Sequence, residues 1–411
     1  FVDRKQSGGI SHFLVAEPRV NATLNLLDSR NNPVFDLLAL TGGFGISNKM
    51  PTLMYLYPDY AYFDNASLSK YGTETKDRLG LITTDVVKNT ANPDLRPARS
   101  TKWEAGLSFR INRIKGFATF FHESHRHELG FTSQLIWQNY DKYTVPATAT
   151  DPVFDAASGD VTYRVDGTEH TALRTKTTEM YTWSRAANST TTHKHGIEYG
   201  LDFGEIKPLH TSLNISGAWF HIKRKNENMP LNYIYSSFDY VGVLPSGGGN
   251  LRDRFNSTFR LITHIPAIKM VFTTSVQVVW YESTQTIYED ENGNSRYYLK
   301  SYEDKDYLVV DPMGYYDKQG HYTAWSPADA DDADKSRIMY RTQPYLYEKD
   351  VIKPWALLSF RFTKEIGRVA ELSVIANNFT NTKKWHTNPH SLAKTQLYPD
   401  MYFGAELKLK L

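Results

Sequence analysis

Apolar and polar residues alternate strictly along several stretches of the chain, most clearly between residues 353 and 380. In the first run, one set of positions is apolar and holds Ala356, Leu358, Phe360 and Phe362, with Ser359, Arg361 and Thr363 between them. After the polar stretch 364–368 the alternation resumes through Leu372, Val374 and Ala376. Successive side chains of a β-strand point to opposite faces, so a period of two predicts two antiparallel strands. Such a hairpin suits either a half-solvated sheet or the wall of a barrel.

The same pattern recurs along the chain and predicts eleven strands. They span about 18–26, 38–44, 103–112, 116–128, 197–204, 212–219, 254–261, 270–281, 356–363, 371–377 and 403–411. The connections alternate between short turns and long segments, and the long segments near 47–99, 131–193, 225–251 and 282–352 are predicted to be irregular. A meander in which every second connection is long has all its long loops at one end. That arrangement is typical of outer-membrane barrels.

We therefore predict an all-β fold, a transmembrane antiparallel up-and-down β-barrel with long extracellular loops. A barrel with both chain ends on one side needs an even number of strands, and lipid does not accommodate open sheet edges. The first predicted strand is also entered from the side of the long loops. We expect the eleven strands to be part of a larger barrel whose N-terminal portion lies outside this chain.

Composition narrows the choice of function classes. The formal net charge is +2 and the sequence has no basic run, which argues against a nucleic-acid partner. The chain has no cysteine, which favours an oxidising location in the cell envelope. No run of about 18 apolar residues exists, so the sequence predicts no helical membrane span. The 27 tyrosines suit the aromatic girdles of a barrel and also a carbohydrate-binding β protein.

Several stretches carry a resemblance to a known family. Residues 92–97 read Asn-Pro-Asp-Leu-Arg-Pro, and Glu104-Ala105-Gly106 follows at the start of a predicted strand. This resembles a mid-barrel stretch of TonB-dependent outer-membrane transporters, although Ala98 stands where that family usually has Glu. Residues 376–381, Ala-Asn-Asn-Phe-Thr-Asn, resemble the penultimate strand of the same family, with Thr380 departing from its signature. The last strand is similar to the assembly signal of barrel proteins, but it ends in Leu411.

The resemblance implies a barrel of 22 strands around a globular plug, so residues 1–411 would be the C-terminal part of the barrel. The plug and the first barrel half would lie outside this chain. It further implies the outer membrane of a Gram-negative cell, a TonB complex as partner, and energy-coupled uptake of a scarce nutrient. It implies no cofactor.

The substrate class stays open at the level of the sequence. An iron chelate or haem is favoured, because the Asp-Pro-Glu that often follows the penultimate strand in the starch-utilisation type is not found. An oligosaccharide or peptide, taken up with a surface lipoprotein, is the alternative within the family. A passive porin and a soluble glycan-binding β protein are the alternatives outside it.

The predicted loops are rich in tyrosine and tryptophan, and the predicted lumen face carries arginines. The loop aromatics are candidates for an external substrate site: Tyr55, Tyr57, Tyr60, Tyr62, Trp137, Tyr140, Tyr315, Tyr316 and Trp325. Packing of the large loops against one another explains the same rings equally well. The lumen candidates are Arg110, Arg254, Arg260 and Arg361. In a plugged barrel they would bond to carboxylates of the plug, and in an empty porin they would tune ion selectivity; we favour the plug.

Only one dense histidine cluster is present, at His122, His125 and His127. His125 and His127 would share a strand face and could hold a metal or haem, but no partner carboxylate can be placed beside them. Exposed or girdle positions are the commoner role, so no metal site is predicted. The acidic run 329–334 lacks the glycine and terminal glutamate of a calcium loop. Neither a G-x-S-x-G nor a P-loop motif occurs, and an enzyme is not expected.

Overall fold

The computed structural model describes residues 10, 12–302, 305–397 and 400–409. Eleven strands pair in chain order into one antiparallel sheet, and β21 (Asp350–Ile352) pairs with β15 beside them. The eleven are β1 (Arg19–Asp28), β2 (Leu37–Lys49), β5 (Ala98–Ile111), β6 (Ile114–Thr144), β10 (Leu173–Ile206), β11 (Thr211–Asn226), β14 (Gly248–Ile265), β15 (Met270–Tyr288), β22 (Trp355–Ile366), β23 (Ala370–Asn377) and β26 (Tyr402–Leu409). Each overlaps one predicted strand, so the all-β antiparallel prediction is confirmed; residues 410–411 of the last prediction lie outside the described residues.

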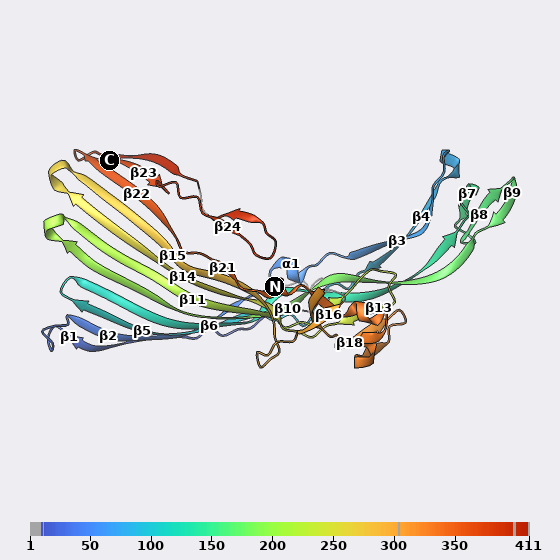
Figure 1. Cartoon of the computed structure of the whole chain (residues 1–411), viewed down its shortest axis with the longest axis horizontal. Helices are drawn as coiled ribbons and strands as arrows, with labels where there is room; N and C mark the ends of the chain where they lie inside the picture. The colour runs from blue at the N-terminus through green and yellow to red at the C-terminus, as the bar shows by residue number, and fades with distance from the viewer. Residues whose placement is uncertain (1–9, 11, 303–304, 398–399, 410–411) are drawn as a thin grey trace.

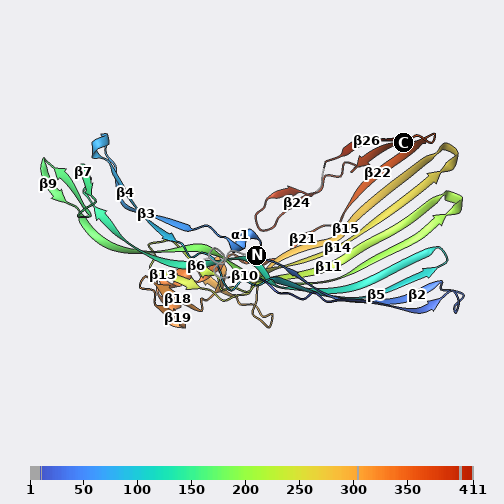
Figure 2. The same ribbon diagram turned by 180° about the vertical axis from the view of Figure 1, so that it is seen from behind.

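The sheet fans and curves from β1 and β2 at one edge to β23 and β26 at the other (Figures 1 and 2). Among the described residues, β1 pairs only with β2 and β26 pairs only with β23. Both edges of the sheet are therefore open in this chain, and closure into a barrel remains a proposal. None of the helices in the described part of the chain is both long enough and apolar enough to cross a membrane.

The connections alternate in length as predicted. The short ones span 29–36, 112–113, 207–210, 266–269 and 367–369, and they gather at one end of the sheet (Figure 1). In four of them one residue adopts a positive φ, which turns the chain tightly: Asn112, His210, Lys269 and Gly367. The long connections leave from the opposite end.

Cross-strand pairing gives the sheet one face on which apolar residues predominate. One row of paired residues crosses eight strands through Leu38, Phe109, Gly116, Leu201, Ile215, Phe259, Val276 and Leu358. Directly paired residues point to the same side, so the apolar face is continuous. Leu107 lies on it and is 42% exposed, while Leu201, Phe259 and Leu358 are only partly buried. This face is therefore not a closed protein core.

Aromatic rings border the apolar face on the side of the long connections. Trp103 lies 5.4 Å from Phe120, centroid to centroid, and Phe255 lies 6.5 Å from Trp280. Trp219 pairs with Ile197 on one side and with Phe255 on the other, which continues the row across the sheet. The apolar face therefore ends in a row of aromatic side chains.

The opposite face is polar, and its row includes Arg110, Lys115, Asp202, Asn214, Arg260, Ser275 and Ser359. Arg254 and Arg361 lie on the same face, because they stand an even number of residues from Arg260 and Ser359 along their strands. The pairing thus places all four predicted lumen arginines on one side of the sheet.

The prediction that residues 131–193 are irregular is wrong. β6 and β10 continue through most of this segment and form an arm that projects beyond the sheet (Figures 1 and 2). The arm ends in β7 (Thr150–Asp155), β8 (Asp160–Val165) and β9 (Thr168–Thr171), and β3 (Ala61–Lys70) and β4 (Leu79–Val87) lie along it. Gln138, Tyr140 and Met180 are buried in the arm. Because both faces of this ribbon are partly covered, its residues do not alternate by polarity.

The other long connections also contain short elements. They are α1 (Leu53–Leu56), β12 (Leu231–Asn232), β13 (Tyr240–Val243), β16 (Tyr298–Tyr302), β17 (Lys305–Val310), β18 (Gly314–Asp317), β19 (Tyr322–Ala324), β20 (Tyr340–Thr342), β24 (Trp385–Thr387) and β25 (Lys394–Gln396). β12, β13, β18 and β19 form one small sheet, and it draws its strands from two different connections. The long connections therefore fold against one another.

Candidate ligand-binding site

The predicted loop aromatics fall into two groups, and the first joins the arm to the segment 311–325. Trp137 of β6 donates from Nε1 to the carbonyl of Asp317 at 2.8 Å, and its ring meets Tyr316 edge-on at 5.7 Å. Tyr315 is buried and packs edge-on against Tyr240 of β13 at 5.2 Å. Trp325 packs against the same cluster. In this group the structure shows rings that hold loops together.

Tyr140 lies inside the arm. It is 7% exposed, and its hydroxyl donates to Oε1 of Glu179 at 3.0 Å. The hydroxyl of Tyr181 lies 2.7 Å from Oε2 of the same carboxylate. Burial alone would raise the pKa of Glu179, but these hydroxyl groups favour its charged form and hold the pKa below the usual value. The network fixes β6 and β10 to each other beyond the sheet.

The second group lies on the segment around α1, at the foot of the arm. Tyr55 packs its ring 5.3 Å from Phe131 and lines a hollow of about 350 Å³. The hollow lies over the polar face, where Ser100 and His125 contact the carboxylate of Glu123 at 3.0 and 3.3 Å. Its cationic lining consists of Lys49, Arg99 and Arg224, and these three make no ion pair with any described residue. A second hollow of about 240 Å³ shares Ser47, Ser100 and Glu123 with it, so the two form one polar groove.

Tyr57 lines a separate and larger hollow of about 870 Å³. Tyr60 and Tyr62 belong to the same lining, and they are 51% and 64% exposed. The remaining lining residues are Pro58, Asp59, Lys88, Asn89, Thr90 and Ala91. The chain therefore keeps two large rings in contact with solvent inside a concave site, instead of packing them.

The structure separates the three predicted metal candidates. His122 pairs across the strands with His195, and His195 pairs with His221. The ring centroids of His195 and His221 lie 5.0 Å apart, and Nδ1 of His221 lies 2.7 Å from Oδ1 of Asp253. Sequence analysis missed these partners, which lie on β10 and β11.

The other two candidates do not share a regular strand face. A register shift interrupts the pairing of β6 with β10 between Glu128 and His125, and His127 has a φ of 57°. The prediction that His125 and His127 share a strand face is therefore wrong. Within the described ranges, no three His, Cys, Asp or Glu side chains are placed to hold a metal ion.

Three of the four polar-face arginines have acidic neighbours in the described part of the chain. Arg361 donates to Glu406 at 2.9 Å and to Ser373 at 3.0 Å. Arg110 and Arg254 approach Asp36 and Glu282 at 3.9 and 4.0 Å. Arg260 is exposed and makes no ion pair with the described residues. Contact of these arginines with a plug stays a prediction.

No protein-family model, no curated protein and no solved structure matches the chain. The functional assignment therefore rests on the geometry of the sheet, of the polar groove and of the tyrosine-lined hollow, together with the sequence resemblance.

Proposed function

We propose that this chain is the C-terminal part of the barrel of a TonB-dependent transporter in a Gram-negative outer membrane. The observation that carries the proposal is the continuous apolar face, which crosses the sheet and is bordered by aromatic rings. Lipid is the solvent in which such a face is stable without a protein cover. The gathering of every long connection at one end adds support.

The open edges at β1 and β26 fit the same proposal. Unpaired backbone groups are not tolerated in lipid, so the remaining barrel strands would complete the wall. The polar face would then line the interior, where Arg260 and its neighbours would meet the plug. A TonB complex would supply the energy for uptake, as the sequence resemblance implies.

Two observations weigh against the rival classes. A soluble glycan-binding β protein would need another layer over the apolar face, because exposed apolar patches of this extent are rare in soluble monomers. A passive porin needs a single constriction loop, whereas here the long connections build an arm and a separate small sheet.

The sequence alone favours an iron chelate or haem as the substrate, with an oligosaccharide or peptide as the second candidate. The tyrosine-lined hollow favours the second candidate. Its lining holds one acidic and one basic side chain, Asp59 and Lys88, so no net positive charge is present for an anionic chelate.

The test uses the whole protein to which this chain belongs, expressed in its own host. We expect it in the outer-membrane fraction, with heat-dependent electrophoretic mobility and no steady conductance in planar bilayers. Nutrient uptake should stop when TonB is deleted. Solubility without detergent would contradict the membrane assignment, and steady open channels or TonB-independent uptake would favour a porin.

A further inference from the structure

The tyrosine-lined hollow of about 870 Å³ combines exposed rings with unpaired polar groups. Tyr60 and Tyr62 present more than half of their surface to solvent, and Tyr57 lies beside them, partly buried. Asp59 and Asn89 are exposed and make no hydrogen bond or ion pair with the described residues. A site that keeps donors, acceptors and ring faces unsatisfied is suited to a ligand that supplies all three contacts.

We propose that this hollow is an oligosaccharide-binding subsite. The proposal rests on the proposed function and names the substrate class of the transporter. Sugar rings present C–H groups on one face and hydroxyl groups around the edge. Tyrosine rings can stack on the C–H face of a sugar. A carboxylate and an amide can bind its hydroxyl edge, since each of these two groups can form hydrogen bonds with two neighbouring hydroxyl groups.

The lining argues against the other substrate classes. An anionic iron chelate calls for net positive charge, but Asp59 offsets Lys88. A peptide calls for apolar side-chain pockets, and apart from the tyrosines only Pro58 and Ala91 are apolar here. The volume of about 870 Å³ falls within the range of pockets that take molecules of several rings.

The position of the hollow suits capture before transport. Tyr55 and Tyr57 are separated by one residue, yet Tyr55 lines the polar groove and Tyr57 lines the tyrosine-lined hollow of about 870 Å³. The segment around α1 therefore borders both sites. Buried Leu56 packs this segment against Ala186 of the arm and Leu95, which anchors it. A sugar chain held in the hollow would have its free end close to the polar groove.

The experiment titrates the whole protein, purified in detergent, with maltoheptaose, cellohexaose and mannohexaose by isothermal calorimetry. We expect at least one of them to bind. Tyr60→Ala and Tyr62→Ala should each weaken that binding about tenfold, because each removes a stacking ring. Tyr62→Phe keeps the ring and should stay close to the unmodified protein.

Tyr71→Ala is the matched control. Tyr71 follows β3 directly and is 84% exposed, but it lies outside the lining of the hollow. The proposal is overturned if none of the three sugars binds with a Kd below about 10 mM, or if Tyr71→Ala weakens binding as much as Tyr62→Ala. It is also overturned if Tyr62→Ala abolishes binding of ferric citrate, used as the chelate probe. None of these outcomes changes outer-membrane localisation or TonB-dependent uptake, which test the transporter assignment separately.

Discussion

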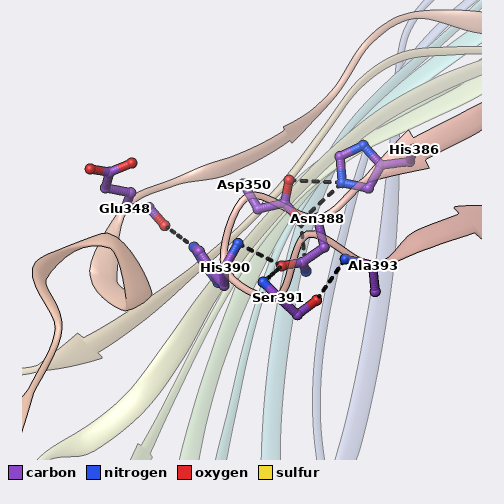
Figure 3. Close-up of polar contacts among 7 residues, drawn as sticks. All are labelled: Glu348, Asp350, His386, Asn388, His390, Ser391 and Ala393. Atoms are coloured by element: carbon purple, nitrogen blue, oxygen red, sulfur yellow. Dashed lines mark hydrogen bonds and ion pairs between the residues drawn. The ribbon is translucent and has the colours of Figure 1, made fainter.

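Asp350 and His386 join two connections that are distant along the chain. Nε2 of His386 lies 2.9 Å from Oδ1 of Asp350, and both side chains are largely buried (Figure 3). Asp350 belongs to β21, which pairs with β15, and His386 belongs to β24 in the last long connection. Asn388 adds a weaker contact to the same carboxylate at 3.4 Å. The pair therefore fastens the last connection to the side of the sheet.

Replacing His386 by alanine should release this connection. The carboxylate of Asp350 would stay buried with only the weaker contact to Asn388, at a cost of about 1–3 kcal/mol. Amide hydrogen exchange in residues 384–397 should accelerate. Lys394→Ala, an exposed change in the same hairpin, is the control and should leave exchange unchanged. Equal exchange in both variants would show that other contacts hold the connection.

The two faces of β5 should respond differently to charge. Leu107→Lys places a cation on the apolar face and should cost about 2–4 kcal/mol if that position lies near the middle of the bilayer. Ser108→Lys places the same cation on the polar face and should be tolerated. The measurement is the fraction of protein that reaches the heat-modifiable, folded form in the outer membrane. Equal folding of the two variants would contradict a lipid-facing role for Leu107.

The indole of Trp137 should contribute to docking of the segment 314–324 on the arm. Trp137→Phe keeps an aromatic ring against Tyr316 but removes the donor to Asp317, at a cost of about 0.5–1.5 kcal/mol. Trp137→Ala should cost more, because the edge-on contact is lost as well. Hydrogen exchange at 314–324 should rise in that order. An unchanged rate in Trp137→Ala would mean that the small sheet of β12, β13, β18 and β19 holds the segment alone.

Acid should weaken the turn at residues 326–338. Nζ of Lys335 lies 2.7 Å from Oδ1 of Asp329, and this contact lowers the pKa of the carboxyl group below its usual value. The resulting stabilisation is complete above the unfolded carboxyl pKa of about 3.9, and it is lost as the pH falls through the lower, folded pKa.

The variant Asp329→Asn should remove the part of this acid dependence that the contact with Lys335 supplies. Asp332 keeps its own part, because the backbone N–H groups of Lys335 and Asp334 lower the pKa of its carboxyl group. Hydrogen exchange at 326–338, corrected for intrinsic chemistry, should rise between pH 5 and strongly acidic pH in the unmodified protein, and it should rise less in Asp329→Asn. Asp331→Asn, in the same acidic run, is the control and should keep the acid step. An acid step of equal size in Asp329→Asn and in the unmodified protein would assign it to another group.

The strands of the sheet could be predicted because their signal is local. The face on which Leu358 or Arg361 lies depends only on the alternation along its own strand, and the turns at Asn112 and Gly367 are set by a few neighbouring residues. The same alternation predicted the face of the sheet that carries Arg110, Arg254, Arg260 and Arg361.

The arm and the sites depend on contacts between distant residues. β6 and β10 extend past the predicted strands because β3, β4 and the buried contact between Tyr140 and Glu179 support them. Because these strands are partly buried on both faces, they lack the alternation of apolar and polar residues that would have predicted them. Likewise, the pairing of β6 with β10 decides that His122 faces His195 and not His127.

By itself, the sequence determined the all-β class, the number of strands in the main sheet, the order of short and long connections, and which residues share a face. Only the tertiary structure decided which aromatic rings are packed and which remain exposed. Trp137 and Tyr315 became loop anchors, whereas Tyr60 and Tyr62 stayed open to solvent around a hollow. The physical reason is that alternation fixes the direction of a side chain relative to its own strand, while burial depends on which distant segment is placed against it.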